Sequence, residues 1–271
     1  MNKDAAEPVV MTLSGNDPSG GAGIQADIEA IASMGCHAAP VITVLTVQDT
    51  QDVKSLVAVS PGLVAAQARA VLEDMPVAAI KIGLVASVEV VEVIHTLLMD
   101  YQHIPVILDP VLASGGGTEL SEDGLVDAIR DLLLPLTTVL TPNSIEARRL
   151  AREADNLDAC AMALLALECE FVLITGTHEN SPKVVNTLYG NRRRLELFSW
   201  ERLPGTYHGS GCTLAAAIAA LIAHGQEAPG AIRQAQEYTW AALRAGQRLG
   251  MGQSIPNRLF WANQGNIRHG K

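Results

Sequence analysis

The sequence predicts an α/β fold, a three-layer sandwich in which helices cover both faces of a mostly parallel central sheet. Short runs rich in Val, Ile and Leu alternate with longer Ala- and Leu-rich stretches along most of the 271 residues, and this alternation is typical of parallel strands joined by helices. The strand runs are continuously apolar, which indicates strands that are buried on both faces. One segment near residue 190 departs from the pattern and predicts an antiparallel hairpin at an edge of the sheet.

The predicted parallel strands are short apolar runs, several of which stop at a glycine, a proline or a polar residue. They cover Val9 to Leu13, Ala39 to Thr46, Ala78 to Ile82, Pro105 to Leu108, Val139 to Thr141 and Phe171 to Thr175. The edge hairpin is predicted from Val184 to Leu188 and from Arg193 to Trp200, with a turn at Tyr189-Gly190-Asn191-Arg192. Its three consecutive arginines suit an exposed edge strand.

The predicted helices show apolar residues at helical spacing, as Ile24, Ile28 and Ile31 do in the first of them. Gly35 is expected to end that helix, and Pro61 suits the first turn of the next one. The expected helices are Gly23 to Met34, Pro61 to Glu73, Val88 to Tyr101, Gly124 to Leu134, Asn143 to Glu153, Leu157 to Leu167, Thr213 to His224 and Ala228 to Gly246.

Composition excludes several classes of protein. A chain with 48% hydrophobic and 18% charged residues and a mean hydropathy of +0.21 is not disordered. A formal net charge of -10 does not suit a general nucleic-acid binder. With no continuous apolar run long enough for a membrane span and no signal-peptide pattern, we expect a cytoplasmic protein that binds neither membrane nor nucleic acid.

The chain shows no repeat, low-complexity segment or linker, so we expect one domain over residues 1–271, with 1–8 as a flexible N-terminus and 255–271 as a C-terminal tail. The four cysteines form no C-x-x-C pair and no zinc-site spacing. We expect no disulfide. Cys36, Cys160 and Cys169 are interpreted as small buried side chains.

A glycine-rich loop follows the first strand, at residues 14–23, and its glycines would let the backbone approach a ligand. Asp27, one turn into the next helix, has two interpretations: a solvated helix residue, or a carboxylate that points at a ligand's amino group. Gln48 follows the second strand and offers both donors and acceptors, which suits a ring nitrogen with an amino group. A loop glutamine in water is an equally good interpretation.

Three further polar segments follow strands. Asp109 stands directly at a strand's end, which suits a Mg²⁺ ligand. Asn143 and Glu146 fit a helix start, with Thr141 or Asn143 as the cap, Pro142 in the first turn and Glu146 closing a capping box; capping does not exclude a position near phosphates and their metal. Thr175-Gly176-Thr177-His178 is a polar loop after the last predicted parallel strand.

The strongest candidate for chemistry is Gly209-Ser210-Gly211-Cys212-Thr213, ahead of an Ala-rich helix. Glycines leave backbone N–H groups unshielded, and a helix N-terminus adds roughly half a positive charge. Together they predict an anion site for a phosphate or a developing oxyanion. A thiol in this position is expected to have a lowered pKa.

Taken together, these segments resemble the ribokinase-like superfamily, and within it the hydroxymethylpyrimidine and phosphomethylpyrimidine kinases of thiamine biosynthesis. The resemblance covers roughly Val9 to Leu249 and rests on four runs: residues 14–27 (SGNDPSGGAGIQAD), Lys81-Ile82-Gly83, Asp109-Pro110-Val111, and His208-Gly209-Ser210-Gly211-Cys212-Thr213-Leu214. It implies a ribokinase-like sandwich and two successive ATP- and Mg²⁺-dependent phosphorylations, first of an alcohol and then of its monophosphate. It also implies a homodimer.

The resemblance implies a role for each candidate residue. Gly15, Asp27, Gln48 and Val111 would line the pyrimidine pocket, and Asp109 and Glu146 would lie at the Mg²⁺. The nucleotide would lie near Asn143, Thr175, Thr177 and His178. Gly209, Ser210 and Gly211 would form the anion hole beside the catalytic Cys212, which would take the proton of the substrate's hydroxymethyl group or hold that group in line with the γ-phosphate.

The sequence departs from the family pattern at four positions. Gly115 and Thr175 stand where relatives carry lysines, Ser210 replaces a threonine and Leu84 replaces a methionine. Two alternatives therefore stay open beside the pyrimidine kinase: a pyridoxal kinase of the same fold, and a degenerate kinase that binds a pyrimidine without catalysis.

Overall fold

Nine strands form one sheet, in the order β3-β2-β1-β4-β5-β6-β7-β8-β9. The structure is a computed structural model that describes residues 7–112 and 123–262. The strands are β1 (Val9–Asn16), β2 (His37–Gln48), β3 (Val53–Ala58), β4 (Val77–Ile82), β5 (Val106–Leu108), β6 (Val139–Leu140), β7 (Phe171–Ile174), β8 (Lys183–Gly190) and β9 (Arg193–Glu201).

The middle of the sheet is parallel, as predicted, and both edges are antiparallel. β2, β1, β4, β5, β6 and β7 run in one direction. The predicted β8–β9 hairpin forms one edge, and Asn191 and Arg192 form its two-residue turn with φ of 50° and 55°. The antiparallel strand β3 at the other edge was not predicted, because its residues are mostly exposed and polar residues interrupt its apolar ones.

The helices lie close to their predicted ranges. They are α1 (Gly23–Ser33), α2 (Pro61–Asp74), α3 (Val88–Asp100), α4 (Asp123–Ala128), α5 (Ser144–Leu150), α6 (Leu157–Leu165), α7 (Ser210–Ala223) and α8 (Ala228–Arg244). After α4 the chain continues through a π-helical turn (Ile129–Leu133) and a 3₁₀ turn (Leu134–Leu136). α7 begins three residues earlier than predicted, which places Ser210, Gly211 and Cys212 in its first turn.

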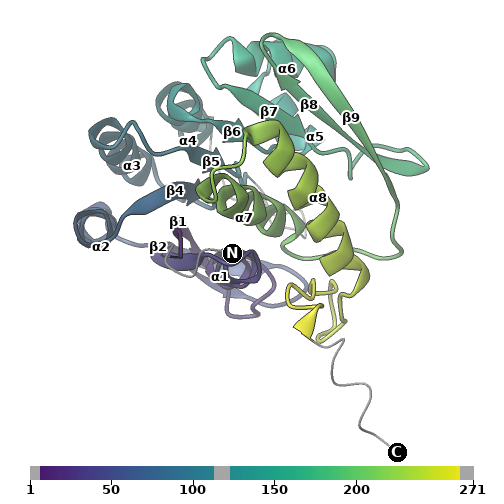
Figure 1. Cartoon of the computed structure of the whole chain (residues 1–271), viewed down its shortest axis with the longest axis horizontal. Helices are drawn as coiled ribbons and strands as arrows, with labels where there is room; N and C mark the ends of the chain where they lie inside the picture. The colour runs from purple at the N-terminus through teal and green to yellow at the C-terminus, as the bar shows by residue number, and fades with distance from the viewer. Residues whose placement is uncertain (1–6, 113–122, 263–271) are drawn as a thin grey trace, which may run out of the picture.

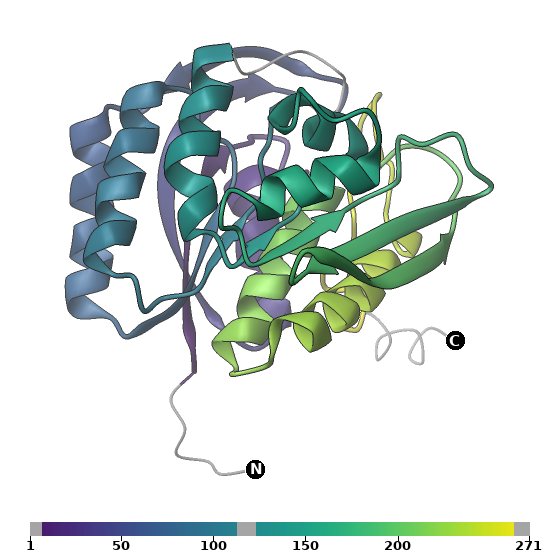
Figure 2. The same cartoon turned by 90° about the horizontal axis from the view of Figure 1, so that it is seen from above.

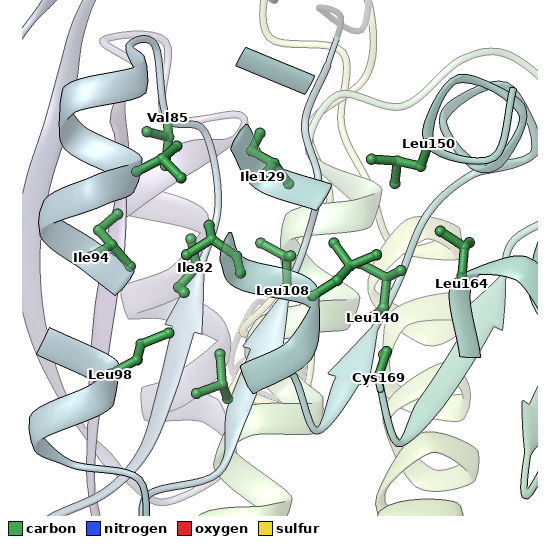
Figure 3. Packing of buried hydrophobic residues seen from close by; sticks show 14 of the residues in the cluster. Ile82, Val85, Ile94, Leu98, Leu108, Ile129, Leu140, Leu150, Leu164 and Cys169 are labelled. Atoms are coloured by element: carbon green, nitrogen blue, oxygen red, sulfur yellow. The ribbon is translucent and has the colours of Figure 1, made fainter. Parts of the chain in front are cut away.

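Two helical layers enclose the sheet, which confirms the three-layer sandwich (Figures 1 and 2). α1, α7 and α8 pack on one face, and α2 to α6 pack on the other. Figure 3 shows part of the second interface, where Ile94 and Leu98 of α3 lie over Ile82 of β4, with Leu108 of β5 beyond it. Thr213 to Leu221 in α7 are all buried, so this Ala-rich helix packs close to the sheet and its first turn is fixed in place.

The described cysteines are all free thiols, and Cys36, Cys160 and Cys169 are buried, as expected for small core residues. Within the described ranges, no helix combines the length and the hydrophobicity that a membrane crossing requires. Part of the segment predicted as a C-terminal tail packs on the body of the molecule, because Tyr238 of α8 donates a hydrogen bond to the Arg258 carbonyl and its ring contacts that of Phe260 in a tilted arrangement.

Candidate active site

The predicted site residues gather at one edge of the sheet, where the parallel strands end. Gly15 lies near the end of β1, Gln48 ends β2, Asp109 follows β5 and Thr175 follows β7. The first turns of α5 and α7 lie at the same edge, since Glu146 and Cys212 both interact electrostatically with Asp109. Ligands of open α/β sheets bind at this edge.

The glycine-rich loop (residues 14–23) is organised by Asp17. This carboxylate accepts hydrogen bonds from the backbone N–H groups of Ser19 and Ala22, both at 2.8 Å. His208 Nε2 lies 2.8 Å from Asp17 Oδ2. Burial opposes ionisation of Asp17, but the hydrogen bonds from His208 and Ser19 outweigh it and lower the pKa of Asp17. The loop is therefore held by an ionised carboxylate.

The loop packs directly against the cradle, which we define as residues 209–212. A Cβ on Gly209 would lie 2.0 Å from the carbonyl oxygen of Gly21, and a Cβ on Gly21 would lie 2.1 Å from His208 Cδ2. Gly209 also has a φ of +76°, a conformation that favours glycine. A side chain at Gly209 would push the loop and the cradle apart, and one at Gly21 would displace the His208 ring.

The cradle supplies the unpaired backbone N–H groups of a helix start. Gly209 caps α7, and Ser210, Gly211 and Cys212 form its first turn, where backbone donors have no partner inside the helix. A Cβ on Gly211 would lie 3.5 Å from Asp109 Oδ1, so the carboxylate lies beside the cradle. This geometry suits an anion that carries a metal ion, and the anion site stays a prediction.

Cys212 keeps part of its surface exposed, but protein groups that include Asp109 and Lys81 surround its thiol. The electrostatics of the thiol therefore differ from the prediction. Burial raises the pKa of Cys212 to about 12, and the neighbouring Asp109 carboxylate adds to the increase. Lys81 acts in the opposite direction but is outweighed. The predicted lowering of the thiol pKa is therefore wrong for the chain without ligands, because burial, aided by the neighbouring carboxylate, overcomes the effect of the helix N-terminus. The thiol donates a hydrogen bond to Asp109.

Asp27 has no exposed surface, so the solvated interpretation is wrong. Its Oδ1 lies 2.9 Å from Lys81 Nζ, and neither side chain is exposed. Thr12 and Ser14 donate hydrogen bonds to its other oxygen. Contact between Asp27 and a ligand stays a prediction.

Lys81 was not among the predicted site residues, although Lys81-Ile82-Gly83 belongs to the motif. Burial alone would lower its pKa, but Asp27 raises the pKa of Lys81 above its usual range, with weaker help from Cys212 and Asp109. A Cβ on Gly83 would lie 2.6 Å from Lys81 Nζ. The glycine therefore leaves room for the ammonium group.

Gln48 and Gly15 lie at the ends of the neighbouring strands β2 and β1, whereas Val111 follows β5, which β4 separates from β1. Their contact with a pyrimidine stays a prediction. The Gln48 amide lies 2.8 Å from His208 Nε2 and accepts a hydrogen bond from Thr46 at 3.1 Å, so it is not free in water. A Cβ on Gly15 would lie 3.2 Å from Leu84. Val111 is partly exposed.

Asp109 and Glu146 are buried carboxylates that fit a divalent cation. Asp109 Oδ2 is buried and has no hydrogen-bond partner among the described residues. Burial raises the pKa of Glu146 to about 8, and repulsion by Asp109 contributes; burial also raises the pKa of Asp109. No cluster of three or more His, Cys, Asp or Glu side chains suits a metal within the described part of the chain, but Mg²⁺ commonly takes only one or two carboxylates.

The capping box predicted for α5 is confirmed. The Asn143 side chain accepts the N–H groups of Ile145 and Glu146, both at 2.9 Å, and Glu146 accepts the N–H of Asn143 at 2.9 Å. Pro142 precedes the cap instead of lying in the first turn.

Of the four residues predicted to lie near the nucleotide, two are in direct contact. Asn143 pairs with Thr175 across an isolated parallel bridge, whereas Thr177 and His178 are exposed beyond it. Gly115, where relatives carry a lysine, lies outside the described residues.

Residues 17–257 match the family model described as phosphomethylpyrimidine kinase. The chain belongs to this family. A hydroxymethylpyrimidine/phosphomethylpyrimidine kinase of Synechococcus elongatus is 39% identical, over 92% of this chain and 96% of the relative. Its counterpart in Escherichia coli is 35% identical, over 90% and 94%. A bifunctional thiamine biosynthesis protein of Geobacter sulfurreducens is 35% identical, over 93% of this chain but 52% of its own length.

Solved structures of two members of the same fold superpose closely. The ADP complex of Bacillus subtilis pyridoxal kinase gives a TM-score of 0.87 at 28% identity, over 95% of this chain and 99% of the other. A phosphomethylpyrimidine kinase of Clostridium difficile gives 0.75 at 31% identity, over 86% and 98%. The fold is therefore ribokinase-like, and the chain is a kinase.

Proposed function

We propose that this kinase transfers the γ-phosphoryl group of ATP to 4-amino-5-hydroxymethyl-2-methylpyrimidine and then to its monophosphate, in thiamine biosynthesis. The observation that carries the proposal is the contact between loop and cradle. Gly23 donates its backbone N–H to the Cys212 sulfur, so the loop expected to hold the pyrimidine meets the turn expected to hold the phosphate. An alcohol bound between them would lie beside both.

In this proposal the pyrimidine lies among Gly15, Gln48 and Val111, with the buried Asp27–Lys81 pair beneath it. Gln48 supplies donors and acceptors for a ring nitrogen and an amino group. Its contact with His208 limits how far the amide can turn. A ligand without the matching donors and acceptors would leave the polar groups of Gln48 unpaired. It would therefore bind more weakly, which would give the site its specificity.

Cys212 would act as a neutral thiol. In the chain without ligands, burial raises the pKa of Cys212 to about 12, so the thiol would first have to lose its own proton before it could act as a base. Holding the alcohol in line requires no such loss. Phosphoryl transfer depends mostly on positioning and charge stabilisation, so either role suffices.

ATP and Mg²⁺ complete the proposed site. Asp109 and Glu146 would hold Mg²⁺, which would neutralise charge on the transferred phosphate, and the N–H groups of the cradle would stabilise its oxygens. Asn143, Thr175, Thr177 and His178 would lie along the nucleotide. A cytoplasmic location and a homodimer belong to the same proposal, on the resemblance alone.

A panel of kinase assays tests the proposal against the pyridoxal alternative, which the likeness to a pyridoxal kinase favours. ADP release is measured with ATP and Mg²⁺ on the hydroxymethylpyrimidine, on pyridoxal and without an acceptor. We expect kcat/KM for the pyrimidine to exceed that for pyridoxal at least tenfold. Turnover of pyridoxal alone would replace the proposal with the alternative, and binding of the pyrimidine without turnover would support a degenerate kinase.

A further inference from the structure

Arg258 is the largest of the fully buried side chains in the described chain, with 1% of its surface exposed. It lies after α8, in the segment that the sequence predicted as a tail. A buried guanidinium group is costly unless its donors are satisfied. Its partners therefore show what the side chain holds in place.

The guanidinium group joins three elements. Nε donates to Thr213 Oγ1 in α7 at 2.9 Å. Nη1 donates to the carbonyl of Gly20 at 3.3 Å, and Nη2 donates to the carbonyl of Gly21. Nη1 also forms an ion pair with Glu29 of α1 at 3.0 Å. One side chain thus bridges α7, α1 and the glycine-rich loop between β1 and α1.

These hydrogen bonds connect Arg258 to both sides of the candidate site, which are the cradle and the glycine-rich loop. Thr213 Oγ1 accepts from Arg258 and itself donates to the carbonyl of Gly209 at 2.8 Å, so Arg258 reaches the cap of α7 through one hydroxyl. In the glycine-rich loop, Gly21 packs against Gly209 so closely that a Cβ on Gly209 would not fit. Arg258 therefore fixes the spacing of the glycine-rich loop and the cradle.

Arg258 does not act as a ligand of the phosphate. Its charge is paired with Glu29, its donors point to protein acceptors, and almost none of its surface is exposed. Its influence on chemistry must pass through the backbone that it holds. Misplacement of reacting groups by about 1 Å can cost about 10²-fold in rate.

We propose that Arg258 is a positioning residue for phosphoryl transfer. It keeps the glycine-rich loop at the correct position relative to the cradle. The proposal rests on the proposed function for its kinetic readout. In the proposed function, the pyrimidine binds mainly at the glycine-rich loop and the phosphates of ATP bind mainly at the cradle. Phosphoryl transfer requires the two to be correctly placed relative to each other. Loss of the guanidinium group is therefore expected to lower kcat more than it raises either KM.

The kinetic test uses the full chain with Arg258→Met, Arg258→Lys and Arg258→Ala. We expect kcat to fall at least tenfold in the first two, with both KM values within about threefold of wild type. Lysine keeps the charge but cannot reach Thr213 and both carbonyls together. Methylguanidinium added to Arg258→Ala is expected to restore part of kcat.

Tyr238→Phe is the matched control, because it removes the hydrogen bond to the Arg258 carbonyl (2.8 Å) and leaves the guanidinium contacts intact. We expect its kcat to stay within twofold of wild type. A fall in kcat equal to that of Arg258→Lys would overturn the proposal, because loosening the segment alone would then explain the effect.

Alkylation of Cys212 by iodoacetamide, followed by mass spectrometry, gives a readout independent of activity. The N–H of Gly23 in the loop is hydrogen-bonded to the Cys212 sulfur. We therefore expect faster alkylation of Cys212 in Arg258→Met than in wild type. Cys36, Cys160 and Cys169, which are at most 3% exposed, report global unfolding and should stay unmodified.

Wild-type kcat and wild-type Cys212 alkylation in folded Arg258→Met would contradict the proposal. Equal alkylation of all four cysteines would reduce Arg258 to a residue needed only for folding. If Arg258→Met does not fold, Arg258→Lys decides by the same two readouts. A wild-type enzyme that phosphorylates no pyrimidine would defeat the proposed function instead, and the alkylation result would still test the positioning role.

Discussion

Individual side chains of the site are held by partners far away in sequence. Asp27 is paired with Lys81, His208 joins Asp17 to Gln48, and the three contacts span 54, 191 and 160 residues. Burial raises the pKa of both Cys212 and Glu146, and the buried carboxylate of Asp109 adds to both increases. The chemistry of each candidate residue is thus decided by its neighbours.

Replacing Cys212 tests its role directly. We expect Cys212→Ala to lower kcat by about 10²-fold or more, which is the scale of general acid–base and positioning effects. The side chain is partly exposed, so the denaturation midpoint should change little. If the thiol only holds the alcohol, Cys212→Ser should retain more activity than Cys212→Ala. Near-normal turnover in Cys212→Ala would remove Cys212 from the mechanism.

At this scale the sequence predicted which residues meet but not how they interact. Asp109, Cys212 and the glycines of the loop were identified because their types and positions after strands are informative. The raised pKa of Cys212 was not predicted, because it depends on burial and on the carboxylate of Asp109, more than 100 positions earlier in the chain. Lys81 and Arg258 were missed for the same reason, since a sequence does not show which cations are buried.

Secondary-structure elements position these residues by their ends. α7 starts at Ser210 although Ser210 and Gly211 are poor helix formers. The buried stretch behind them and the contact of the Gly209 cap with Gly21 fix the first turn. This explains why propensity placed the start at Thr213. The strand β3 was missed because a short exposed edge strand has little periodic signal, whereas the buried strands and the long helices were predicted to within a few residues.

The loop after β7 is held by β8 and α8. Asn186 Oδ1 accepts the N–H of Gly176 at 3.1 Å, and its amide donates to Gln236 at 2.9 Å. In Asn186→Ala, the buried N–H of Gly176 loses its partner, at a cost of about 1–3 kcal/mol. We expect the KM for ATP to rise several-fold while the KM for the pyrimidine stays within about twofold.

Steady-state kinetics with each substrate varied in turn checks the expectation for Asn186. Val185→Ala is the control, since adjacent residues of a strand face opposite sides and Val185 is 38% exposed. Equal changes in the two KM values of Asn186→Ala would contradict a specific role of this loop in nucleotide binding.

In the whole molecule, the candidate site lies at the point between β1 and β4 where the strand order reverses. From β1 the chain proceeds to β2 and β3 on one side, and then returns to β4 on the other side of β1. The chain after β1 leads to α1 on one face, and the chain after β4 leads to α3 on the opposite face (Figure 1). Such a switch point is where open α/β sheets bind ligands, and Gly15 and Leu84 face each other there. The alternation of strands and helices predicted this architecture.

A mass-spectrometric product assay with 4-amino-5-hydroxymethyl-2-methylpyrimidine, ATP and Mg²⁺ tests the proposed activity itself. We expect the wild-type chain to add one phosphate to form the monophosphate and then a second to form the diphosphate. The monophosphate supplied alone should gain one phosphate. Absence of any phosphorylated pyrimidine, under conditions where the chain is folded and binds ATP, would contradict the proposed activity.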